Sequence, residues 1–148
     1  MVAAILVLTV GLGGSPALAQ PRSAEQVVSK YDYKTTMRRL ARAIGQNEMV
    51  SLIISSPKGA LKRIGVEIPG NNVLGVFAPR FAKRLLEAEP AAGIEAPLRV
   101  YVREAKDGKV TVSYFKPTAI FAPYKNEELD RMAHELDEIL ARIVKAVR

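Results

Sequence analysis

The apolar and polar positions of this chain fall into alternating strand-like and helix-like stretches. Two neighbouring segments, 98–103 and 110–114, alternate strictly between apolar and polar residues, as half-buried strands do. The turn Lys106-Asp107-Gly108-Lys109 between them predicts a hairpin. Further strands are predicted over residues 27–31, 50–55 and 73–78. The adjacent apolar residues at the centre of 50–55 indicate a strand buried on both faces.

Helices are predicted where apolar residues recur every three or four positions. They are expected from the N-cap Asp32 to Gly45, over 60–64, over 81–89, and from about 126 to the end. The stretch after Pro117 is expected to be irregular. The predicted order is therefore β-α-β-α-β-α-β-β-α. This order predicts an α+β (mixed α/β) domain with a single mixed, largely antiparallel sheet of about five strands and helices mainly on one face.

Residues 1–19 are uncharged and contain an apolar run of about ten residues, shorter than the roughly 20 needed to span a bilayer. Ala17-Leu18-Ala19 has the small-x-small pattern of a signal-peptidase site, so residues 1–19 are predicted to be a signal peptide cleaved between Ala19 and Gln20. No basic residue precedes the run. An uncleaved anchor or an apolar first strand are the alternatives. A polar spacer, 20–26, and a single domain, 27–148, follow, and the processed protein is expected to be periplasmic or secreted and not integral to the membrane.

The chain has 148 residues, 49% of them hydrophobic, and a formal net charge of +7 that residues 20–94 mostly carry. A domain of this size can bury a core without metals or disulfides, and none of its residues is cysteine. The basic side chains suggest an anionic envelope surface or an acidic partner, against the alternative of solvated helix faces. Export and the few interleaved aromatic residues argue against nucleic acid. These cations are Lys34, Arg38, Arg39, Arg42, Lys58, Lys62, Arg63, Arg80, Lys83 and Arg84.

The residues offer no recognisable catalytic constellation. Thiol chemistry and zinc–thiolate sites are excluded by the absence of cysteine. His134 is the only histidine, and its acidic helical neighbours Asp130 and Glu138 form a weak metal motif that is expected to be a solvated face. Ser113 has no identifiable base partner. No metal, cofactor or catalytic residue is therefore predicted, and an enzyme without a recognisable motif is the less favoured alternative.

The predicted hairpin carries the candidate binding residues. If Leu98, Val100 and Val102 face the core, Arg99, Tyr101 and Arg103 share the opposite face of the sheet. Arginine and tyrosine are enriched at protein interfaces, so the favoured interpretation of this face is a dimer contact. A solvated outer face is the second interpretation and a small-anion site the third. The candidate ligand-binding residues are Arg80, Arg99, Tyr101 and Tyr114.

Several motifs in succession resemble one bacterial and archaeal family. They are a strand ending in Ala-Pro at 72–79, a helix at 81–86, the segment 93–102, Tyr114 and Pro117. Together they are similar to the domain of unknown function 302 over about 27–147. The resemblance implies a compact α/β domain that usually forms homodimers and has no established enzymatic activity.

The chain departs from this family at two places. Members often carry Cys-Asn-Pro at the end of the third strand and Pro-Cys-Asn before the fourth, where this sequence has Phe77-Ala78-Pro79 and Pro97-Leu98-Arg99. The sequence therefore predicts an exported, cysteine-free, homodimeric member. Its expected function is non-catalytic binding of a ligand, such as a small anion, or accessory work in the periplasm. An interaction module for an anionic envelope surface or an acidic partner is the alternative.

Overall fold

The computed structural model describes residues 22–148. The signal peptide predicted for residues 1–19 and its cleavage point between Ala19 and Gln20 lie outside the described residues. No helix in the described part of the chain is long and apolar enough to cross a membrane.

The centre of the fold is one open sheet with the strand order β1-β5-β4-β3-β2. All four pairings between neighbouring strands are antiparallel, which confirms the predicted fold class and shows that the sheet contains no parallel pair in this part of the chain. The strands are β1 (Glu25–Val28), β2 (Val50–Ser55), β3 (Asn71–Phe77), β4 (Leu98–Glu104) and β5 (Val110–Tyr114).

Helices fill the connections between the strands and follow the last one. The α-helices are α1 (Tyr33–Gln46), α2 (Pro57–Arg63), α3 (Pro79–Ala88), α4 (Pro117–Phe121) and α5 (Glu127–Lys145). Two 3-10 helices are η1 (Pro90–Glu95) and η2 (Ala122–Tyr124).

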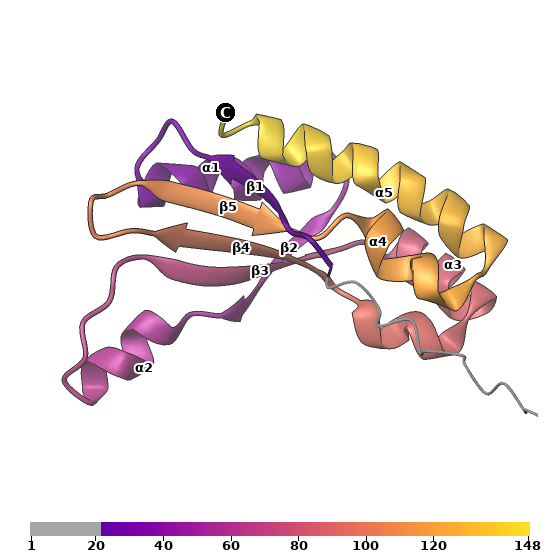
Figure 1. Ribbon diagram of the computed structural model, residues 1–148, viewed down its shortest axis with the longest axis horizontal. Helices are drawn as coiled ribbons and strands as arrows, with labels where there is room; N and C mark the ends of the chain where they lie inside the picture. The colour runs from indigo at the N-terminus through magenta and orange to yellow at the C-terminus, as the bar shows by residue number, and fades with distance from the viewer. Residues whose placement is uncertain (1–21) are drawn as a thin grey trace, which may run out of the picture.

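The core lies between the sheet and a layer of helices on one of its faces. In Figure 1, α1 and α5 lie along the sheet, and α3 and α4 gather beside the first half of α5. The alternation of β4 sends Leu98, Val100 and Val102 into this core, as predicted, and all three are buried. No helix of residues 22–148 covers the opposite face of the sheet (Figure 1). Helix α2 projects away at the other end of the molecule from α3 and buries none of its residues (Figure 1).

The first strand begins and ends earlier than the sequence pattern predicted. Pairing with β5 starts at Glu25, inside the segment expected to be a spacer. The strand ends at Val28. The Ser29 amide still donates to the Val110 carbonyl at 2.8 Å, while its hydroxyl lies 2.7 Å from that of Thr36 and accepts from the Tyr31 amide at 3.1 Å, so Ser29 links β1 to the start of α1. The predicted N-cap is confirmed, since the Asp32 carboxylate accepts from the Thr35 amide at 2.7 Å.

Strand β2 is exposed, which corrects the prediction that it is buried on both faces. None of its residues is buried, and Ile53 is 66% exposed. It is an outermost strand: β3 pairs along one side, and the other side has no strand within the described residues. Unlike β1 at the other edge, which buries Val27, β2 has neither face covered closely enough to bury a residue. An apolar run is compatible with a central strand or an exposed edge, and only the strand order distinguishes the two.

The stretch after Pro117 is helical rather than irregular. Helix α4 begins with Pro117, and the Asp137 carboxylate of α5 caps it by accepting from the Thr118 amide at 3.1 Å and the Thr118 hydroxyl at 2.7 Å. The cap comes from 19 positions further along the chain, so the local sequence gives no signal for this helix.

Candidate ligand-binding site

A hollow crosses the helix-free face of the sheet from β1 to β3. The register places Tyr101 of β4 between Val73 of β3 and Ser113 of β5, so these side chains share this face. We call this hollow the open-face groove. Its lining residues are Ala24, Gln26, Val73, Arg99, Tyr101, Arg103, Ser113, Tyr114 and Phe115.

Two arginines give the open-face groove its charge. Arg99 and Arg103 are exposed and lie two positions to either side of Tyr101, so their Cα atoms are about 13 Å apart along the strand. Neither forms an ion pair within residues 22–148. Guanidinium groups without a carboxylate partner keep their donors free for an anion, which they bind in bidentate geometry.

Tyrosine side chains add polarity without charge. The Tyr101 hydroxyl accepts a hydrogen bond from Asn71 Nδ2 at 2.8 Å, which fixes the ring in the groove. Burial, the nearby Glu104 carboxylate and Tyr101 raise the pKa of Tyr33, whose ring lies against Gly70 beside this region, to about 12. The Tyr33 phenol is neutral at physiological pH. It is not part of the lining, in which Arg99 and Arg103 are the only charged side chains among the described residues.

Of the four residues predicted to bind a ligand, the structure brings Arg99 and Tyr101 together on one face. Tyr114 also borders the groove, but its register partner is the buried Val100, so its ring belongs to the core side and is only 8% exposed. Arg80 does not line the groove. Its guanidinium donates to the Glu48 carbonyl at 2.9 Å and lies over the Phe81 ring at 4.8 Å. Phe115 and Val73, which sequence reasoning missed, provide the apolar part of the lining.

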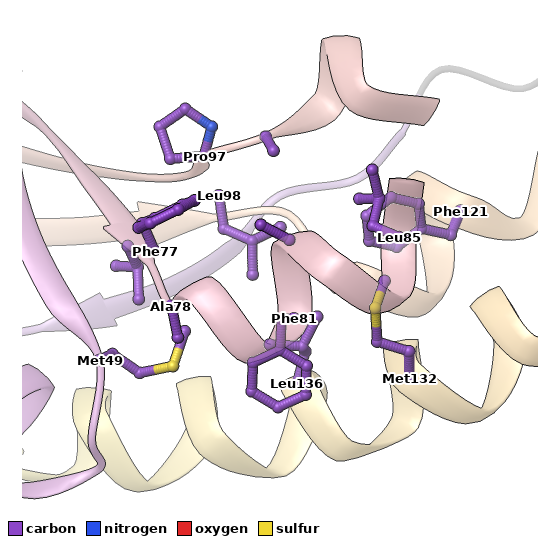
Figure 2. Close-up of a pocket in the computed structure, with 13 residues that line it drawn as sticks. Met49, Phe77, Ala78, Phe81, Leu85, Pro97, Leu98, Phe121, Met132 and Leu136 are labelled. Carbon is purple, nitrogen blue, oxygen red and sulfur yellow. The ribbon is translucent and has the colours of Figure 1, made fainter. Parts of the chain in front are cut away.

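A second hollow lies inside the helix side of the molecule, between the ends of β3 and β4, α3 and α5. Figure 2 shows apolar side chains converging on it, among them Phe81 and Leu85 of α3 and Met132 of α5. The hollow has a volume of about 30 Å³, the size of a single small molecule such as water. No charged side chain lines it in the described residues, so nothing there would orient a polar ligand.

The apolar cavity includes the two positions where the sequence departs from the cysteine-containing motifs that the family resemblance implies. Phe77 and Leu98 both line it (Figure 2), and Leu98 pairs with Val76, the neighbour of Phe77. In this chain Leu98 is buried in the core, whereas Phe77 is only partly buried, and both side chains are hydrocarbons. They supply no thiol, metal ligand or nucleophile.

The predicted basic residues divide among three helices. Arg38, Arg39 and Arg42 belong to α1, and Lys58, Lys62 and Arg63 to α2. Those of α3 lie next to acidic residues, and Arg84 is held between Glu128 and Glu135 of α5 at 2.8 Å each. Hydrogen bonds from Arg84 hold the pKa of both carboxyls below the usual value. This cluster joins α3 to α5 and has a structural role.

Nothing in residues 22–148 groups three or more metal-ligating side chains. His134 is exposed on α5.

The fold is that of a small α+β domain in which one helix layer covers one face of an antiparallel sheet. Within this class, the chain belongs to the family named Domain of unknown function DUF302, whose model matches residues 25–147. A crystal structure of an uncharacterised conserved DUF302 protein from Bacillus stearothermophilus is similar in fold, with a TM-score of 0.73 and 20% sequence identity. The match covers 84% of this chain and 98% of that one. No curated protein matches the sequence.

Proposed function

We propose that this protein is an exported, non-catalytic binding protein whose open-face groove holds a small organic anion. The observation that carries the proposal is the pair Arg99 and Arg103, which flank Tyr101 on the helix-free sheet face without a carboxylate partner in the described chain.

The lining favours a carboxylate attached to an apolar or aromatic group. Phe115 and Val73 provide apolar surface beside the two guanidinium groups, and the Tyr101 ring lies between the arginines. A ligand that has both a carboxylate and an apolar group buries apolar surface and also forms charge-assisted hydrogen bonds.

Binding is favoured over catalysis by the types of residue in the lining. As far as residues 22–148 describe the groove, it contains no histidine and no carboxylate, and Ser113 is its only aliphatic hydroxyl. A hydroxyl without a neighbouring base is a weak nucleophile, and proton transfer needs a group that titrates near neutral pH.

The experiment is a calorimetric titration of the protein with benzoate, phosphate and the neutral benzamide at low salt. Benzoate is expected to bind and benzamide to fail, because only benzoate combines a ring with a charge for the arginines. Arg99→Gln is expected to weaken benzoate at least tenfold, since a hydrogen bond to a charged group contributes about 1.5–3 kcal/mol. Lys109→Gln is the matched control, because it removes an equal charge from an exposed site outside the groove.

Two results would overturn the proposal. One is the absence of binding by both anions at low salt. The other is an equal loss of affinity in Arg99→Gln and Lys109→Gln, which would mean that net charge and not the groove attracts the anion.

Export to the periplasm is a separate part of the proposal. It is supported by the uncharged apolar run and by Ala17-Leu18-Ala19. Mass spectrometry of the exported protein is expected to find Gln20 as its first residue, and an intact Met1 would contradict export with cleavage.

We also propose a homodimer formed through β2. This edge strand has no charged residue and exposes Leu52, Ile53 and Ile54, a pattern that invites pairing with another strand. Light scattering is expected to give the mass of a dimer, and Ile53→Lys a monomer. Ile94→Lys, at an 85% exposed position on η1, is the control that should remain a dimer. A monomeric wild type would refute this contact.

A further inference from the structure

Ion pairs are unevenly distributed over the molecule. Those of residues 22–148 gather around α3 and α5, with Arg84, Arg131 and Lys83 as the main cations. At the other end, Lys58, Lys62 and Arg63 of the projecting helix α2 are all exposed, and none of them forms an ion pair with any part of the described chain. Unpaired cations on a projecting element keep their full charge for an external partner.

Exposed aliphatic side chains accompany these cations. Ile64, directly after the last residue of α2, is 73% exposed, and Val66 is 43% exposed. Gly65 between them has a φ of 78°, which turns the chain sharply and leaves both side chains outside the fold. These apolar side chains directly follow Lys62 and Arg63, so the tip of α2 is amphipathic, and α2 buries none of its own residues.

Two further segments bring cations to the same end. The ring of Tyr33, at the start of α1, lies against Gly70, and the Glu104 amide, before the β4–β5 turn, donates to the Gly70 carbonyl at 2.8 Å. The α2–β3 connection therefore meets both segments, and Figure 1 shows α2 and the β4–β5 turn at one end of the molecule. We call this surface the basic end. It consists of Lys34, Lys58, Lys62, Arg63, Ile64, Val66, Lys106 and Lys109, all exposed. Two exposed carboxylates, Glu67 and Asp107, lie among them, so six cations and two anions give this surface a net charge of +4.

We propose that the basic end docks the protein on an anionic phospholipid surface. The cations lie against the headgroups, and Ile64 and Val66 enter the boundary between headgroups and acyl chains. Each lysine or arginine near such a surface adds about fivefold to the affinity, and inserted aliphatic side chains add to it. Nucleic acid fits less well, because α2 and its flanks, 56–67, carry no aromatic side chain on which bases stack. This role uses a different surface from the open-face groove and does not depend on the proposed anion binding.

The test is sedimentation of the purified protein, residues 20–148, with vesicles of phosphatidylcholine alone or with about one-third phosphatidylglycerol. Binding is expected only to the anionic vesicles and is expected to fall steeply with salt. The triple variant Lys58→Gln, Lys62→Gln, Arg63→Gln is expected to bind the anionic vesicles about 100-fold more weakly. The three lost cations each contribute about fivefold to the affinity, and these factors multiply. The matched control removes the same charge from the opposite end with Lys83→Gln, Lys116→Gln and Lys125→Gln.

A second pair of variants tests the aliphatic contribution. Ile64→Ser with Val66→Ser is expected to weaken vesicle binding, whereas Ile94→Ser, which alters an 85% exposed residue away from α2, leaves it unchanged. Since all these side chains are exposed, the variants are expected to unfold at the wild-type urea concentration.

Three results would overturn the proposal. The first is no binding to anionic vesicles at low salt. The second is an equal loss in the Lys83, Lys116 and Lys125 control, which would show attraction by net charge alone. The third is a dimer that dissociates in Ile64→Ser with Val66→Ser while vesicle binding persists, because the tip would then be covered by a second copy of the chain.

Discussion

The contact between Gly70 and Tyr33 gives a sharp test of the packing at the start of β3. A Cβ atom placed on Gly70 would lie 2.4 Å from Cγ and Cδ2 of the Tyr33 ring. Carbon atoms that are not bonded pack at about 3.5–4.0 Å, so Gly70→Ala forces the ring or the backbone to move. Tyr33 is the first residue of α1 and packs against the core, so moving its ring costs packing contacts.

The expected loss is worked from two opposing effects. Overpacking costs about 1–3 kcal/mol, and replacing glycine by alanine regains about 0.4–1 kcal/mol by restricting the unfolded chain. The free energy of unfolding should therefore fall by about 1–2 kcal/mol. The melting temperature should fall by about 3–6 °C for a domain of this length.

The assay is a double-mutant cycle measured by urea unfolding with circular dichroism. In the Tyr33→Ala background the ring is gone, so adding Gly70→Ala should be neutral or slightly stabilising, and the two changes should be coupled by more than 1 kcal/mol. Gly59→Ala is the control, because an added Cβ there meets nothing within 4 Å. Equal losses from Gly70→Ala in both backgrounds would refute the ring contact as the cause.

Two further predictions concern the core and the α3–α5 contact. Leu129→Ala removes a fully buried side chain and should cost about 2–5 kcal/mol in urea unfolding, whereas Leu86→Ala, at a 53% exposed site, should cost under about 0.5 kcal/mol; similar losses at both would contradict the core assignment. Arg84→Gln should destabilise the protein at pH 7 and much less at pH 2–3. The lowered pKa values of Glu128 and Glu135 mean that their stabilising effect is present above the normal carboxyl pKa and is lost as pH falls through the folded values. A pH-independent effect of Arg84→Gln would refute the ion-pair explanation.

The candidate groove shows how far residue patterns lead towards a site. The strict alternation of 98–103 correctly placed Arg99 and Tyr101 on the face opposite Val100, because side chains alternate along any strand. The same pattern cannot tell which strands lie beside β4. The contributions of Val73 and Gln26 therefore depend on pairings that join residues far apart in the chain.

One residue predicted for the ligand-binding site, Arg80, lies outside the open-face groove. Arg80 follows β3, and the sequence predicts it near Arg99. In the structure the chain enters α3 at Pro79, and the Arg80 guanidinium bonds to the turn after α1. The direction of a side chain at the start of a helix depends on where that helix packs.

By itself the sequence determined the order of the elements, the buried face of the hairpin and the N-cap at Asp32. These features come from local periodicity and from side chains that bond within a few residues of themselves. The tertiary structure alone decided that β2 is an exposed edge, that Asp137 caps α4 and that the helices of the described chain cover only one face of the sheet. Each of these features depends on contacts between segments that are far apart in the chain. Such segments compete to pack on the same apolar surface, and the outcome depends on the packing of the whole core.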